Sequence, residues 1–308
     1  DRKKTYRSPI FNNSWNIKNN IFQLFFYNYN LMTNYHSFHI VTISPWPLIN
    51  SFNLINLLLN FILYFKFSYF SRTILIINKI IILISIFLWW RDISRERTYQ
   101  GFHTINVIKG LKLGIILFIT RELIFFISFF WSFFHFSLAP EIETGLNWPP
   151  TGIKIFNPYE IPLLNTIILL SSGVTITWAH HAIFKNCLIN LIISLNLTIL
   201  LGTTFTIFQI FEYLTRQFII NDRSFRSIFY IATCFHGTHV IIGTIFITTN
   251  MTRWIKLEIN NKHHLCFEIR AWYWHFVDVI WIYLYTILYW WFYFFYSLTK
   301  NMVLKKPK

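Results

Sequence analysis

Apolar residues in this chain come in seven long blocks, separated by short stretches in which charged residues and prolines collect. Each block is close to the ~20 residues that an α-helix needs to cross about 30 Å of hydrocarbon. The blocks do not alternate between apolar and polar residues, as the strands of a membrane β-barrel would. We therefore expect seven transmembrane helices, at about 47–70, 73–90, 112–137, 160–181, 188–212, 227–251 and 272–296.

Composition supports a membrane protein, because 55% of the 308 residues are hydrophobic and only 13% are charged. The formal net charge of +15 would suggest nucleic acid in a soluble protein. Here the Lys and Arg residues lie mostly around the apolar blocks, so we expect no nucleic-acid partner. Their distribution favours an N-terminus on the positive, matrix-like side. The three cysteines lie far apart and predict neither a disulfide nor a zinc cluster.

The two ends of the chain differ from its apolar middle. Residues 1–31 are polar, Asn-rich and basic, with no block long enough to span a membrane, and residues 297–308 end in a basic tail. We expect residues 1–31 to be an N-terminal extension, residues 32–296 to form the seven-helix transmembrane domain, and residues 297–308 to be a disordered tail. Clusters of Trp and Tyr near the block ends match the aromatic belts of membrane proteins. They lie at 89–90, 272–274 and 289–291.

Aromatic and histidine-rich motifs follow one another in a fixed order along the chain. In the first half they are Ser-Pro-Trp-Pro at 44–47, Trp-Trp-Arg-Asp at 89–92, Tyr-Gln-Gly-Phe-His-Thr at 99–104, and Phe-Trp at 130–131 followed by Ser-Leu-Ala-Pro at 137–140. In the second half they are Trp-Pro-Pro-Thr-Gly-Ile at 148–153, Ile-Pro-Leu-Leu-Asn-Thr at 161–166, Ile-Thr-Trp-Ala-His-His at 176–181, Phe-His-Gly-Thr-His-Val-Ile-Ile-Gly at 235–243 and Trp-Tyr-Trp-His-Phe-Val-Asp-Val-Ile-Trp at 272–281. Over about residues 36–291, this series resembles subunit III of mitochondrial haem-copper cytochrome c oxidases.

The resemblance implies an all-α, polytopic membrane protein whose first two helices are splayed from the other five around a lipid-filled cleft. It implies a core subunit of the respiratory oxidase in the mitochondrial inner membrane, packed against subunit I, with subunit II and accessory subunits as further partners. Such a chain holds structural phospholipids but no cofactor of its own, because haem and copper belong to the partner subunits. It supports assembly, lipid binding, proton uptake and the durability of turnover while oxygen is reduced to water and protons are pumped. The family usually begins near Met32, so residues 1–31 are surplus to it.

Glu122 lies inside the third apolar block. Charged residues at the bilayer centre cost about 2.5–3.5 kcal/mol on insertion scales, so Glu122 is a candidate functional residue. The resemblance implies that it is the family's buried carboxyl, which lies against subunit I near a proton-uptake route. One alternative is a structural carboxyl group that forms hydrogen bonds with a neighbouring helix. Another is the coupling carboxylate of a secondary transporter, although the sequence shows neither the internal repeats nor the broken spans typical of that class.

A basic stretch at 91–103 follows the second apolar block, and we interpret it as a loop at headgroup depth. Basic pockets between helices bind lipid phosphates. The resemblance implies that Arg95 and His103 hold an anionic phospholipid headgroup, with Trp90 and Trp131 against its acyl chains. The alternative is a positively charged loop that only sets the topology.

Histidines and carboxylates in the second half of the chain also permit a metal-site interpretation. His236 and His239 are three residues apart and share one face of a helix. The other candidate ligands are His180, His181, His263, His264, His275, Glu212, Glu268 and Asp278. Because no repeated Glu-x-x-His motif appears, hydrogen bonding between helices is favoured, and we expect no metal in this chain.

Arginine occupies two positions where the resembled family commonly has a small residue, Arg97 and Arg121. Some animal mitochondria read AGA and AGG codons as serine and AUA as methionine, and this chain has only three methionines. We hypothesise that these two positions, together with Arg223 and Arg226, carry serine or a similar small residue in the natural protein. A CGN codon at any of them would rule this out for that position.

Overall fold

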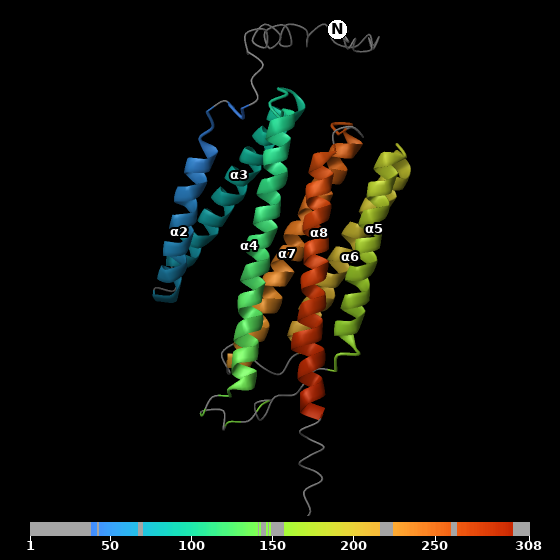
Figure 1. Cartoon of the computed structure of the whole chain (residues 1–308). Helices are drawn as coiled ribbons and strands as arrows, with labels where there is room; N and C mark the ends of the chain where they lie inside the picture. Colours follow the sequence, from blue (N-terminus) through green and yellow to red (C-terminus); the bar gives the residue numbers. More distant parts are fainter. Residues whose placement is uncertain are drawn as a thin grey trace, which may run out of the picture.

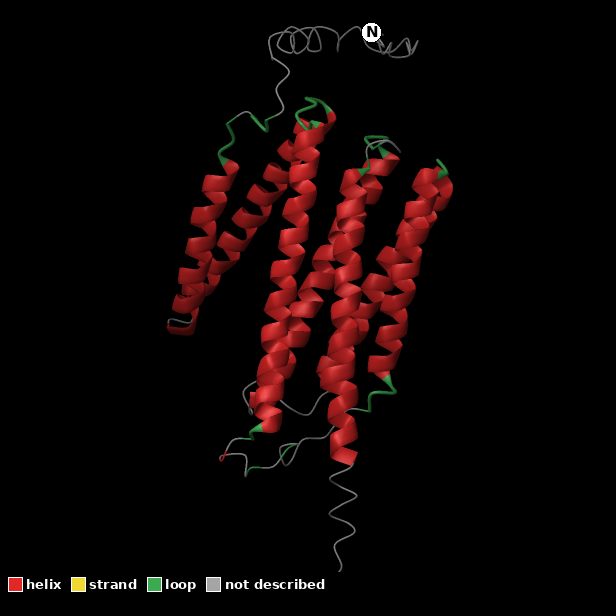
Figure 2. Ribbon diagram, viewed as in Figure 1, coloured by secondary structure: helices red, strands yellow, loops and turns green. Residues whose placement is uncertain are grey.

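The computed structural model describes residues 38–41, 43–66, 70–140, 142, 146, 148, 157–215, 224–259 and 264–297. Across these ranges it is helical without strands (Figures 1 and 2). The helices are α2 (Trp46–Lys66), α3 (Phe70–Thr98), α4 (Ile105–Leu138), α5 (Ile161–Phe184), α6 (Leu188–Thr215), α7 (Ser224–Ile255) and α8 (Leu265–Leu284), which continues into the π-helical segment η2 (Tyr285–Trp291). Seven helices in the described ranges are long and apolar enough to cross a membrane, which confirms the predicted all-α fold with seven transmembrane helices. The splay of the first two around a lipid-filled cleft stays a prediction. The expected N-terminal extension, and the expected tail after residue 297, lie outside the described residues.

Several helices, α3 and α8 among them, extend further than the apolar blocks do. Helix α3 continues to Thr98, so residues 91–98 are helical, and the prediction of a loop there was wrong. Nothing in these residues breaks a helix, and the first breaker is Gly101, whose φ of 68° lies in the left-handed region. Helix α8 begins at Leu265, about seven residues before the predicted span. Hydropathy detects only the part of a helix that lies in hydrocarbon, whereas polar turns continue beyond it.

Helices α2 and α3 form a pair that packs mainly along itself, and its contacts with the other described helices are few, among them the Trp90 ring of α3 against Phe246 of α7. Ser85 Oγ on α3 donates a 2.6 Å hydrogen bond to Oδ1 of Asn50, the one buried residue described in α2. Near the end of the pair, the indole of Trp46 donates a 2.7 Å hydrogen bond to Asp92. Helix α4 packs against α7 and α8, and these two complete a bundle with α5 and α6 (Figure 1).

The bundle is centred on two buried tryptophans of α8. The Trp274 indole donates a 2.9 Å hydrogen bond to Ser172 on α5, and the Trp281 indole donates a 3.0 Å hydrogen bond to Thr166. Glycines at 202 on α6 and 243 on α7 allow these helices to approach the Trp274 ring. Interhelical hydrogen bonds and small residues at close approaches are typical of helix packing in membranes.

These contacts correct the aromatic-belt interpretation of 272–274. Only Trp272 is exposed, at 37%, whereas Tyr273 and Trp274 are buried. Successive residues of an α-helix point about 100° apart, so three consecutive aromatic residues cannot all face lipid. The same holds at 289–291, where Tyr289 is buried and Trp290 is exposed.

Candidate functional site

Glu122 lies at the midpoint of the 34-residue helix α4, about 25 Å along the axis from either end at 1.5 Å per residue. Its side chain is only 14% exposed. The carboxyl group therefore lies near the centre of the bilayer and on the side of α4 that faces α7. This agrees with its expected depth inside the third transmembrane span.

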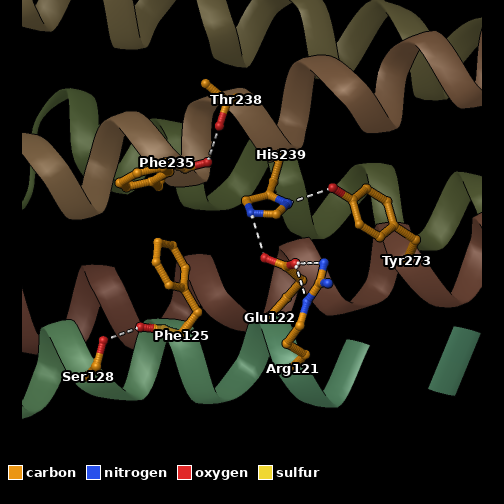
Figure 3. A network of polar contacts seen from close by, with 8 residues as sticks. All are labelled: Arg121, Glu122, Phe125, Ser128, Phe235, Thr238, His239 and Tyr273. Atoms are coloured by element: carbon orange, nitrogen blue, oxygen red, sulfur yellow. Dashed lines mark hydrogen bonds and ion pairs between the residues drawn. The ribbon is translucent and has the colours of Figure 1, made fainter. Parts of the chain in front are cut away.

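The carboxyl group of Glu122 faces a histidine from a second helix, and that histidine in turn contacts a tyrosine from a third (Figure 3). Nε2 of His239, on α7, lies 3.5 Å from Glu122 Oε2. Nδ1 of the same imidazole shares a 2.6 Å hydrogen bond with the hydroxyl of Tyr273, on α8. If the proton of neutral His239 is on Nε2, the ring points a donor at Glu122 and accepts from Tyr273. The three side chains thus form a series of ionisable groups, with neighbouring polar atoms 3.5 Å and 2.6 Å apart.

Aromatic rings pack around this series and bury most of its surface. The His239 ring centroid lies 5.5 Å from that of Phe126 and 6.3 Å from that of Phe276, while the Tyr273 ring lies 6.2 Å from Phe118. The His239 side chain is 12% exposed. In such surroundings a polar side chain has few groups with which it can form hydrogen bonds.

One of those groups is Arg121, which points away from the bundle. Its side chain is 71% exposed, its Nη2 lies 2.7 Å from Glu122 Oε1, and its guanidinium lies 4.9 Å from the centre of the Phe118 ring. A lipid-facing cation at the middle of a span is costly. This placement agrees with the hypothesis that the natural protein has a smaller residue at position 121.

The expected lipid-binding residues lie in two places. Arg95 is on the last turns of α3, with its side chain 57% exposed and 3.8 Å from Asp92. Both line a cavity of about 230 Å³ with Trp46. Trp90 is 45% exposed on the same helix and its ring lies 5.4 Å from that of Phe246.

His103 lies in the short connection between α3 and α4, with its ring 5.7 Å from the His39 ring. Burial lowers the pKa of His103, and the neighbouring Arg97 and His39 lower it further. The side chain is therefore a neutral hydrogen-bonding group at pH 7. The structure does not bring Trp131 to this group, because it lies roughly 40 Å along α4, near the opposite end of the helix.

The histidines considered as metal ligands have different surroundings. His236 Nε2 contacts the backbone oxygen of Val277 at 3.2 Å, and His239 belongs to the Glu122 group, so this pair forms hydrogen bonds to α8 rather than a shared site. By contrast, His180, His264 and Glu268 converge, each offering a ligand atom within 4.8 Å of the others.

The remaining metal-ligand candidates belong neither to the Glu122 group nor to the group of His180, His264 and Glu268. Asp278 is buried, 4.0 Å from His275, and Glu212 contacts the hydroxyl of Tyr289 at 3.4 Å. His181 belongs to no group of possible ligands in the described ranges, and His263 lies outside them.

Tyr273 is the residue of the site that sequence reasoning missed. It lies in a run of aromatic residues that hydropathy assigns to the membrane interface, so nothing marks its hydroxyl as part of a buried group. A signal is present in the spacing. His236 and His239 on α7 meet residues 277 and 273 on α8, one turn apart on each helix.

The fold and this site define a polytopic helical membrane protein with a carboxyl group held near mid-membrane between three helices. Comparisons with known proteins identify the family. The model of cytochrome c oxidase subunit III matches residues 36–293. Cytochrome c oxidase subunit 3 of Rhipicephalus sanguineus is 52% identical over 257 residues, which are 83% of this chain and 99% of the relative. The protein of that name from Pisaster ochraceus is 49% identical over 260 residues, 84% of this chain and 99% of the relative, and that from Aedes aegypti is 50% identical over 256 residues, 83% and 97%.

The chain belongs to the cytochrome c oxidase subunit III family. It is therefore a multi-pass membrane subunit of the respiratory oxidase, a proton-pumping oxidoreductase complex. Membership leaves the secondary-transporter alternative without support.

Proposed function

We propose that this chain is a cofactor-free core subunit that packs against the catalytic subunit I of the oxidase and supports its assembly, its proton uptake and the durability of its turnover. Subunit II and accessory subunits are the further partners, and haem and copper reside in the partner subunits. The location is the mitochondrial inner membrane, with the N-terminus on the matrix side. Within the chain, Glu122 is the carboxyl group associated with the proton route.

The observation that carries this proposal is the Glu122, His239 and Tyr273 series near mid-membrane. Each member can give up or accept a proton, and the contacts are 3.5 Å and 2.6 Å. Buried ionisable groups in a span are expensive, and those that persist are commonly part of proton or ion pathways. This role needs no redox group in this chain, because the delivery of protons to a neighbouring subunit requires only groups that bind and release protons.

Lipid binding is the second part of the proposal. Because α2 and α3 pack mainly along each other, most of the apolar surface that they expose needs another partner, and acyl chains fit the exposed apolar side chains there. Arg95 supplies the cation for a phosphate, and His103 supplies a neutral hydrogen bond beside it. Trp90 lies on the same helix, about 12 Å along its axis from the helix end. Trp131 would contact lipid of the opposite leaflet.

The proposal for Glu122 is tested by replacing it with glutamine in the assembled oxidase. Glu122→Gln keeps the volume and the hydrogen-bonding capacity of the side chain but removes the ionisable carboxyl group. We expect normal assembly, a lower rate of proton-limited turnover and fewer turnovers before inactivation. Oxygen consumption, proton release per electron and the decay of activity during sustained turnover measure the three quantities.

Two comparisons separate a proton role from a structural one. Glu160→Gln makes the same chemical change on an exposed carboxyl at the start of α5 and should leave all three quantities at wild-type values. Tyr273→Phe acts on the same series, so its effect should not add to that of Glu122→Gln, as expected for contacting residues. If Glu122→Gln matches the wild type in all three measurements, Glu122 is scaffolding and this part of the proposal fails.

A further inference from the structure

A second group of polar residues lies at one end of the bundle, away from Glu122. It joins the last turns of α5, where His180 lies, to the start of α8, where His264 and Glu268 lie. His264 Nε2 is 3.2 Å from Glu268 Oε1, and the two residues are four apart on one helical face. The nitrogen and oxygen atoms that the three residues offer all lie within 4.8 Å of one another.

We infer that His180, His264 and Glu268 form a binding site for a divalent transition metal ion of the Zn²⁺ type. Two imidazoles and one carboxylate are a ligand set that zinc accepts, with a fourth position left for water. At bond lengths of about 2.0–2.1 Å, tetrahedral ligand atoms lie about 3.3 Å apart. The His264 and Glu268 atoms already have that spacing, and His180 needs to approach by only about 1–1.5 Å, which side-chain rotation can supply.

His180 provides an independent reason to place a ligand here. Its Nε2 is buried but has no hydrogen-bond partner in the part of the chain that the structure describes. Buried polar atoms in native proteins nearly always have a partner. The ring is held between aromatic neighbours, with its centroid 4.8 Å from that of Phe184 and 5.5 Å from that of Phe267. A metal ion shared with His264 would satisfy this nitrogen.

Two features of the surroundings bear on the orientation of the carboxylate and on access to the site. Lys112 Nζ on α4 lies 2.8 Å from Oε2 of Glu268, which fixes the carboxylate and leaves Oε1 toward His264. Such outer partners commonly orient metal ligands. A cavity of about 370 Å³ is lined by His264, Glu268 and Lys112, and it gives a hydrated ion a polar route to the site. This inference replaces the expectation from sequence that the chain holds no metal, and it does not depend on the role proposed for Glu122.

The test uses purified oxidase complex that contains this chain, washed with a chelator and then titrated with Zn²⁺ alone. Equilibrium dialysis with elemental analysis gives the number of zinc ions per complex and their dissociation constants. We expect His264→Gln to lose one zinc ion that the wild type binds, or to bind it at least about 100-fold more weakly, because loss of an outer-shell partner alone typically costs 10–100-fold. His180→Gln, on the other helix, should lose the same ion.

His135→Gln is the matched control, because it removes one exposed histidine near the opposite end of α4 and should keep the full zinc count. Equal zinc binding by wild type, His180→Gln and His264→Gln would overturn the inference. If neither variant assembles, chemical modification of wild-type histidines decides the matter. Zn²⁺ should protect His180 and His264 from diethyl pyrocarbonate but not His135, and equal modification with and without Zn²⁺ would overturn it.

Discussion

Substitution of Gly243 by alanine is expected to destabilise the bundle strongly. A Cβ atom at this position would lie 2.8 Å from Cε3 and 2.9 Å from Cζ3 of Trp274, closer than real Cβ contacts. The ring cannot move away easily. The opposite edge of the ring packs against Gly202, where a Cβ atom would lie 2.7 Å from Cη2. The indole nitrogen donates a 2.9 Å hydrogen bond to Ser172.

The size of the effect follows from two opposing contributions. Overpacking a well-filled core typically costs 1–3 kcal/mol, and a fixed indole ring places this site toward about 3 kcal/mol. Replacing glycine by alanine within a helix returns up to about 1 kcal/mol through helix propensity. Gly237→Ala, on the same helix, introduces a Cβ with nothing within 4 Å and so reports the propensity contribution alone. Because the propensity gain is common to both variants, we expect Gly243→Ala to be less stable than Gly237→Ala by the overpacking cost alone, about 3 kcal/mol.

The assay is thermal inactivation of the purified complex, followed as loss of this chain from the complex. Because unfolding of such assemblies is commonly irreversible, the comparison is between half-lives at one temperature. Gly243→Ala should shorten the half-life and Gly237→Ala should not. Gly243→Ala combined with Trp274→Leu should be less damaging than the sum of the two single changes, because the smaller side chain removes the clash. Equal half-lives for the two alanine variants would refute the packing argument.

Two further predictions concern pH and the identity of position 121. Burial, and then Arg97 and His39, lower the pKa of His103 from its ordinary value of 6.5. Between the folded and the unfolded pKa, the unfolded chain therefore binds more protons than the folded chain. Stability from this residue should be complete above about pH 6.5 and decrease as the pH falls, and thermal inactivation of His103→Gln should show a weaker pH dependence; an identical pH profile would contradict this. Tandem mass spectrometry of the natural protein should find serine or another small residue at position 121 in place of Arg121, and a peptide with arginine there would disprove the hypothesis.

Hydropathy predicted the seven helices because each apolar block is long enough to cross the hydrocarbon, and that constraint acts on each helix separately. It could not predict where helices end beyond the membrane. The segment from Arg91 to Thr98 is polar and charged, yet it remains helical because no residue in it stops the helix. The early start of α8 has the same origin, with His264 and Glu268 paired across its first turn.

The candidate site could be predicted only in part. Glu122 was found from a rule about a single residue, that a carboxyl group in a membrane span needs an explanation. Which residues contact Glu122 depends on how α7 and α8 are rotated about their axes. The sequence of a helix that is apolar on all sides does not indicate this rotation. For the same reason, Tyr273 was assigned to an aromatic belt while it lies 2% exposed in the interior. The convergence of His180 with His264 likewise requires the packing of α5 against α8.

The motifs that carry the family resemblance lie largely where one helix contacts another. Trp46 of the first motif donates to Asp92 of the second, and Thr166 accepts from Trp281 of the last. These contacts give the motif residues a structural role, because each one provides a hydrogen-bond partner for a buried or partly buried polar group between two helices.

Glu122 differs from these residues. Among the described residues, its short contact of 2.7 Å is with Arg121 on its own helix, while its contact with His239 on α7 is a looser 3.5 Å. If position 121 carries serine in the natural protein, the ion pair disappears, and the carboxyl group keeps only the loose contact to the bundle. A residue placed to stabilise helix packing would have a close partner there. The loose contact therefore agrees with the role proposed above for Glu122, in which the carboxyl group exchanges protons rather than holding helices together.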